Sequence, residues 1–217
     1  MRRNEIRAFT AAAGLVAWSD LIAPRIPPRL QVPLHAALSA ALVVSTGAPL
    51  GLRPPAVRHG LRLGLAVAAA VSVGVAVSSR IPRVRADMAA RRLPGSISGW
   101  LAVRIPVGTV WSEEAAYRAA LGTVAAEAFG PRWGRALQAT AFGLSHVRDA
   151  RTVGEPVVGT MLVTGAAGWA FAWLYERSGS LLAPMLTHLA INESGAIAAI
   201  AVQRAGPRQT SRASARS

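Results

Sequence analysis

Apolar stretches recur along almost the whole chain, separated by short gaps that carry arginine and proline. A helix that crosses the hydrocarbon core of a bilayer needs about 20 residues, and most of these stretches approach that length. The pattern predicts an all-α fold, a polytopic transmembrane helical bundle of about six to eight helices. We expect helices over seven segments: 8–23, 32–52, 61–79, 98–128, 133–148, 156–176 and 181–203.

The fourth of these segments is too long for one straight span. Arg104 and Pro106 lie near its start, and a proline removes a hydrogen bond from a helix interior. We therefore expect a lead-in at the membrane interface that ends near residue 106, followed by a separate transmembrane helix.

The longest polar connection, from Arg80 to Pro94, holds five arginines and one aspartate. It predicts a boundary between N-terminal transmembrane helices over 1–95 and a second helical unit over 96–203. Residues 204–217 are rich in Arg and Ser and lack apolar periodicity, so we expect a disordered tail there.

Composition agrees with a membrane protein. The chain of 217 residues is 52% hydrophobic and 16% charged, whereas a soluble domain carries roughly 25% charged residues. The net charge of +14 does not indicate nucleic acid, because the arginines fall mainly in the gaps, where they contact anionic lipid. We expect the bilayer as a partner and no nucleic acid. The chain uses arginine and no lysine, which indicates a GC-rich, bacterial genome and so predicts a multi-pass protein of a bacterial cell membrane.

The most informative polar residues interrupt the fourth apolar segment, where Arg118 follows the adjacent Glu113 and Glu114. A charged side chain at the centre of a transmembrane helix costs roughly 2.5–3.5 kcal/mol, so these groups must face one another or a polar cavity. Glu114 and Arg118 are i and i+4 on a helix and would form an ion pair. Glu113 would then point into an intramembrane polar cavity. A purely structural network of the three remains an alternative.

Two further clusters follow in later apolar segments. Phe142 and His146 share one helix face, as do His188 and Asn192, because each pair is four residues apart. With Glu113, these clusters supply a carboxylate, two imidazoles and an amide, the groups that activate a water and stabilise a tetrahedral intermediate.

Several kinds of site are excluded or disfavoured. The chain has no cysteine, which excludes disulfides, thiolate metal sites and a cysteine nucleophile. It has no H-E-x-x-H motif, so the usual zincin arrangement is absent. The two remaining histidines, His35 and His59, lie near the starts of N-terminal segments, and we expect both at the membrane interface.

The three ordered motifs resemble those of a known family. E-E-x-x-x-R, F-x-x-x-H and H-x-x-x-N, in the contexts WSEEAAYRAALG, AFGLSHV and LAPMLTHLAINESGA, are similar to the CPBP family (CAAX protease and bacteriocin-processing, or Abi, proteins). These are intramembrane proteases related to type II CAAX prenyl endopeptidases. The resemblance covers about residues 107–203, and 96–203 would be the catalytic core.

The resemblance implies an intramembrane endopeptidase that cleaves membrane-associated proteins or peptides, in CAAX-type or bacteriocin-related processing. Glu113 would be the general base, acting with His146 on the attacking water. His188 and Asn192 would bind the oxyanion of the scissile amide. Three further residues would support these four: Glu114, Arg118 and Phe142.

A metal and the substrate stay open at this point. The family is commonly called metalloprotease, and Glu113, His146 and His188 with a water would suit zinc. The same groups support a metal-free mechanism, which we favour on chemical grounds. The substrate would be a peptide or protein, and whether it is prenylated is open.

Two other classes of function compete with hydrolysis. A catalytically silent membrane scaffold or immunity protein would use the polar cavity for partner binding. A transporter would use the intramembrane charges as a proton relay, but the sequence shows no inverted repeat of broken helices.

Overall fold

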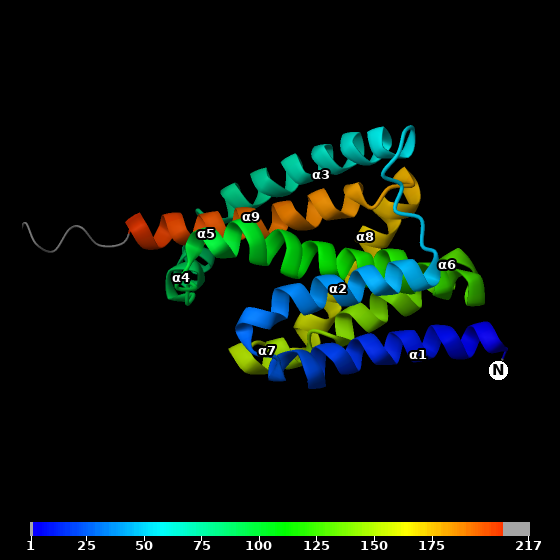
Figure 1. Cartoon of the computed structure of the whole chain (residues 1–217). Helices are drawn as coiled ribbons and strands as arrows, with labels where there is room; N and C mark the ends of the chain where they lie inside the picture. The colour runs from blue at the N-terminus through cyan, green and yellow to red at the C-terminus, as the bar shows by residue number, and fades with distance from the viewer. Residues whose placement is uncertain (1, 206–217) are drawn as a thin grey trace, which may run out of the picture.

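The structure is a computed structural model that describes residues 2–205, and within that range the regular secondary structure is all helical, with short turns and loops between the helices. The long helices lie side by side along one direction (Figure 1). The predicted all-α bundle is therefore confirmed. The first helices are α1 (Arg3–Ala17) with its extensions η1 (Trp18–Ile22) and η2 (Ala23–Arg25), α2 (Pro28–Thr46), α3 (Ala56–Ser78) and α4 (Pro82–Ala90). They are followed by α5 (Ile97–Gly99), η3 (Trp100–Trp111), η4 (Glu114–Leu121), α6 (Gly122–Leu144), α7 (Val147–Val153), α8 (Val157–Ser178) and α9 (Leu182–Ala205).

The helices have the lengths that a multi-pass membrane protein requires. In length and composition, four of them are able to cross a membrane: Arg3–Arg25, Ala56–Ser78, Val157–Ser178 and Leu182–Ala205. The first includes η1 and η2, so the first apolar segment is longer than its sequence pattern indicated. The N-terminus lies at one end of the bundle, and α4, α5 and α7 lie at the other (Figure 1).

The helix that carries the two glutamates does not begin after Pro106. The chain is helical from Ile97 through Pro106 to Phe129, and η3 and η4 within it are π-helical. The looser i→i+5 bonding of a π-helix lets the chain pass a residue that has no N–H. The expected break near residue 106 is therefore wrong. The break falls at Gly130, which has φ 79° and ψ 167° and precedes Pro131.

Two other predicted boundaries are shifted. The polar connection between 80 and 94 contains the helix α4, and α9 continues through Arg204 to Ala205. The rest of the predicted tail, 206–217, lies outside the described residues. The boundary near residue 95 stays a prediction. The N-terminal helices pack against the later ones, α1 on α6, α2 on η3 and η4, and α3 on α9.

Close contact between α6 and α8 fixes the position of the F-x-x-x-H helix. A Cβ atom added at Gly143 would lie 2.6 Å from the carbonyl oxygen of Met161 and 3.3 Å from Cα of Gly165. Phe142 packs equally closely, because a Cβ at Gly168 would lie 2.9 Å from its ring. Only glycine allows the two backbones this separation.

We predict that Gly143→Ala lowers the free energy of unfolding by about 1–3 kcal/mol, because the added methyl group meets backbone that cannot retract. The same shift displaces the helix that carries Phe142 and His146. Unfolding in detergent, followed by circular dichroism, measures the loss. Gly74→Ala is the control, since a Cβ there meets nothing within 4 Å. Equal stability of the two variants would contradict the close packing.

Candidate active site

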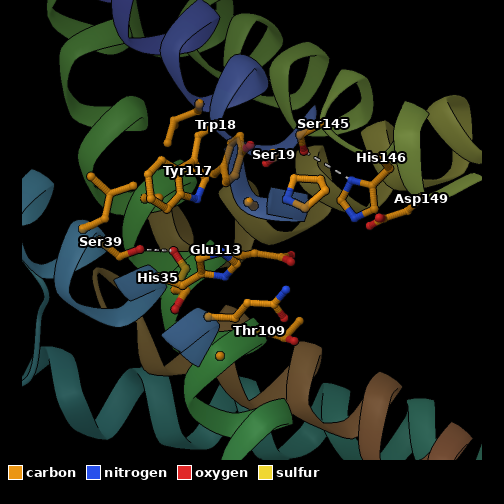
Figure 2. A pocket seen from close by; sticks show the side chains of 18 of the residues that line it. Trp18, Ser19, His35, Ser39, Thr109, Glu113, Tyr117, Ser145, His146 and Asp149 are labelled. Atoms are coloured by element: carbon orange, nitrogen blue, oxygen red, sulfur yellow. Dashed lines mark hydrogen bonds between the residues drawn. The ribbon is translucent and has the colours of Figure 1, made fainter. Parts of the chain in front are cut away.

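A polar cavity of about 540 Å³ lies among η1, α2, η3, η4 and the turn between α6 and α7. Figure 2 shows that the labelled side chains surround it from several helices. Polar and aromatic groups in its wall include Trp18, Ser19, His35, Ser39, Thr109, Glu113, Tyr117, Ser145, His146 and Asp149. The bundle therefore contains a polar cavity next to Glu113, as the intramembrane charges predicted.

Glu113 is the carboxylate that reaches this cavity. Its side chain is 28% exposed, whereas that of Glu114 is fully buried. Oε2 of Glu113 lies 3.9 Å from Nε2 of His188, which is longer than a hydrogen bond. The two adjacent glutamates thus differ in surroundings in the way that the helix geometry predicted.

The ion pair between Glu114 and Arg118 is present and is completely enclosed. Nε of Arg118 lies 3.1 Å from Oε2 of Glu114, and both side chains have no exposed surface. The guanidinium carbon lies 3.9 Å from the ring centre of Phe142 and 5.0 Å from that of Phe171. Aromatic faces attract a desolvated cation, so these rings add to the stability of the pair.

His188 continues this network. Its Nδ1 donates to Oε1 of Glu114 at 2.8 Å, and its ring stacks on Phe171 at 5.0 Å. A carboxylate at one ring nitrogen fixes the orientation of an imidazole and leaves the other nitrogen for chemistry. Here that nitrogen is Nε2, which faces Glu113.

His146 approaches the cavity from the turn after α6. Its Nδ1 donates to the carbonyl oxygen of Phe142 at 2.8 Å, and the two rings meet edge to face at 4.7 Å. The predicted shared face of Phe142 and His146 is therefore observed. Nε2 is the ring nitrogen left for a ligand.

Two predicted catalytic residues, His188 and Asn192, do not line the cavity. Asn192 lies one turn beyond His188 on α9. Nδ2 of Asn192 is buried and has no hydrogen-bond partner among residues 2–205. This amide is a free donor, but it lies outside the 540 Å³ space.

Sequence reasoning missed His35. We expected an interfacial residue, yet His35 lies in the cavity wall with Glu113 (Figure 2). A signal was present one turn further along α2, because Ser39 is a second polar residue on the same face. Ser39 is buried and donates to the carbonyl oxygen of Ser112, beside Glu113. His59, by contrast, is exposed.

The candidate zinc ligands do not form a metal site. In the described part of the chain, no three His, Asp or Glu side chains are grouped so that they could hold a metal ion. Glu113, His146 and His188 come from three helices, and a zinc site needs its ligands about 2 Å from one centre. The arrangement does not fit zinc, and no step proposed below uses a metal.

Comparison with known proteins agrees with the motifs. Residues 95–193 match the family described as type II CAAX prenyl endopeptidase Rce1-like. We call residues 95–193 the Rce1-like domain after this match. The resemblance to CAAX-type membrane proteases is thereby confirmed, and all three motifs lie in the Rce1-like domain. The cavity extends beyond this domain, since His35 and Trp18 precede it. No curated protein and no solved structure shows a significant match to the chain.

We predict that Arg118→Met in the Rce1-like domain lowers the free energy of unfolding by about 3–5 kcal/mol, because it leaves Glu114 buried without its partner. The double variant Arg118→Met/Glu114→Gln should recover most of this loss, since neither charge remains. Denaturant unfolding in detergent measures both.

The control for this pair is Arg135→Met. Arg135 pairs with Glu176 nearer the surface, where the two side chains are 18% and 38% exposed. Loss of a pair that water reaches costs about 0–1 kcal/mol. If Arg118→Met and Arg135→Met lost equal stability, the enclosed ion pair would not have the structural role described.

Proposed function

We propose that this protein is an intramembrane endopeptidase that hydrolyses peptide bonds of membrane-associated proteins or peptides. The observation that carries the proposal is the position of Glu113. Its carboxylate reaches a polar cavity that also contains His146, and His188, held by Glu114, stands behind it. The Rce1-like domain, which belongs to a family of CAAX-type proteases, supports the same reaction.

Glu113 acts as the general base toward a water in the cavity. It takes one proton from the water as the water oxygen attacks the carbonyl carbon of the scissile amide. Nδ1 of His146 donates to the carbonyl oxygen of Phe142, so Nε2 is able to accept a hydrogen bond. Nε2 accepts this hydrogen bond from the second O–H group of the water and so orients the attack. When the C–N bond breaks, Glu113 returns its proton to the leaving nitrogen, and a carboxylic acid and an amine are released.

His188 and Asn192 of α9 are the donors that stabilise the negative charge on the carbonyl oxygen. Because neither lines the polar cavity, this role requires the scissile carbonyl to lie on the α9 side of Glu113, where Nε2 of His188 is found. Because Nδ1 of His188 already donates to Glu114, Nε2 donates to the oxyanion only when the ring carries both protons. The unpaired Nδ2 of Asn192 supplies the second hydrogen bond.

A second, largely apolar cavity supports a membrane-anchored substrate. It measures about 870 Å³ and lies along α1, between α1 and α2. It shares Leu15, Trp18, Leu38 and Ala116 with the polar cavity, so the two spaces adjoin. We propose that the apolar cavity holds the anchor of the substrate, a prenyl group or an apolar peptide segment, in the cell membrane of a bacterium.

The first test is Glu113→Gln, which keeps the size of the side chain but removes the base. We expect turnover of a lipidated or apolar peptide in detergent to fall by about 10²–10⁴, the usual contribution of a general base. Glu127→Gln is the matched control, because Glu127 is exposed on α6. Its turnover should equal that of the wild type.

Unchanged turnover in Glu113→Gln would remove Glu113 from the mechanism. A wild-type protein that cleaves no such peptide, and whose cellular phenotype survives replacement of His146 or His188, would support the alternative of a catalytically silent scaffold or immunity protein.

The second test concerns zinc. Protein purified in chelator, with less than stoichiometric zinc by elemental analysis, should retain full turnover, because the described carboxylates and imidazoles do not converge on one centre. Loss of turnover in chelator, with recovery on addition of zinc but not of magnesium, would show that a metal completes the site.

A further inference from the structure

The polar cavity is completed by helices that precede the Rce1-like domain. η1 contributes Trp18 and Ser19, and α2 contributes His35 and Ser39. The domain itself begins at residue 95. These N-terminal side chains therefore face the same space as Glu113 although they lie outside the recognised motifs.

His35 is the one among them with acid–base chemistry, and it has an unused polar atom. Its Nε2 is buried and has no hydrogen-bond partner among residues 2–205. The ring of His35 packs against the ring of Trp18 in a T-shaped contact, with 5.8 Å between the ring centres. A buried imidazole nitrogen without a partner is destabilising, so it indicates a partner in the working state.

Glu113 is the partner that the cavity offers. Both side chains lie in its wall (Figure 2). Nε2 of His188 lies 3.9 Å from the Glu113 carboxylate, beyond hydrogen-bond distance, and Nδ1 of His188 is occupied by Glu114. The site also holds the carboxylates of Glu113 and Glu114, and Arg118 pairs with that of Glu114. A donor from His35 would therefore satisfy both Nε2 and the uncompensated charge of Glu113.

We propose that His35 is a positioning residue for Glu113. Its Nε2 donates a hydrogen bond to the Glu113 carboxylate, directly or through one water, and holds that carboxylate toward the attacking water. The inference rests on the proposed peptide hydrolysis. It adds to the site a residue from outside the Rce1-like domain.

Two substitutions separate this role from packing. His35→Phe keeps a ring against Trp18 but has no nitrogen, whereas His35→Gln loses the ring and keeps a donor near the position of Nε2. A hydrogen bond to a charged group is worth about 1.5–3 kcal/mol, which corresponds to a fall in kcat of roughly 10–10²-fold for His35→Phe. KM should stay unchanged, and His35→Gln should retain most of the turnover. His59 is an exposed histidine on α3, so the turnover of His59→Phe should equal that of the wild type.

The opposite order, with His35→Phe near wild type and His35→Gln impaired, would show that the ring only packs against Trp18 and would overturn the proposal. Equal turnover of the wild type, His35→Phe and His35→Gln would also overturn the proposal. If His35→Phe does not fold, His35→Ala is assayed with added imidazole, where restored turnover supports the proposal and no restoration overturns it. These failures are distinct from failure of the proposed function, in which Glu113→Gln itself retains activity.

Discussion

The enclosed contact between Arg118 and Glu114 joins four helices, and three of them carry the motifs of the candidate site. The pair belongs to η4, the Phe142 ring over the guanidinium belongs to α6, and the Phe171 ring belongs to α8. His188 of α9 donates to the same carboxylate. Four helices thus meet at one pair of opposite charges. Breaking such a pair costs several kcal/mol because the remaining charge stays buried. The separation of Glu113 from Glu114 depends on it, since Glu114 is engaged from two sides and its neighbour is left toward the cavity.

The sequence predicts best the contacts that are local. The pairs Glu114–Arg118 and Phe142–His146 are four residues apart, and helix geometry alone brings their side chains together. The spacing of His35 and Ser39 marks a polar face on α2, but the helix that this face meets depends on how α2 packs against η3 and η4. The prediction of a break near Pro106 was wrong for a related reason. Proline disfavours an α-helix, but the local sequence does not show that the chain adopts π-helical bonding there.

The site is therefore built from two parts of the chain, and only one of them carries recognisable motifs. The Rce1-like domain supplies the motif residues, and its apolar surroundings make their charges conspicuous. The N-terminal helices supply one wall of the cavity, through Trp18, Ser19 and His35, and most of the adjoining apolar space. Their residues are ordinary for transmembrane helices, apart from His35. Their part in the site is evident only from the folded bundle, which places them in the same cavity as Glu113.

The π-helical stretch from Trp100 to Leu121 also limits how the chain can change in length. An α-helix turns by about 100° per residue, so deletion of one residue here would rotate everything before it relative to everything after it. Arg104 and Thr109, in the cavity wall, would then turn away from the side that Tyr117 faces. No residue of α4 lines that cavity, and the connection around α4 has no such constraint. Insertions and deletions among descendants of this sequence should accumulate between 80 and 96 and be absent between 100 and 121.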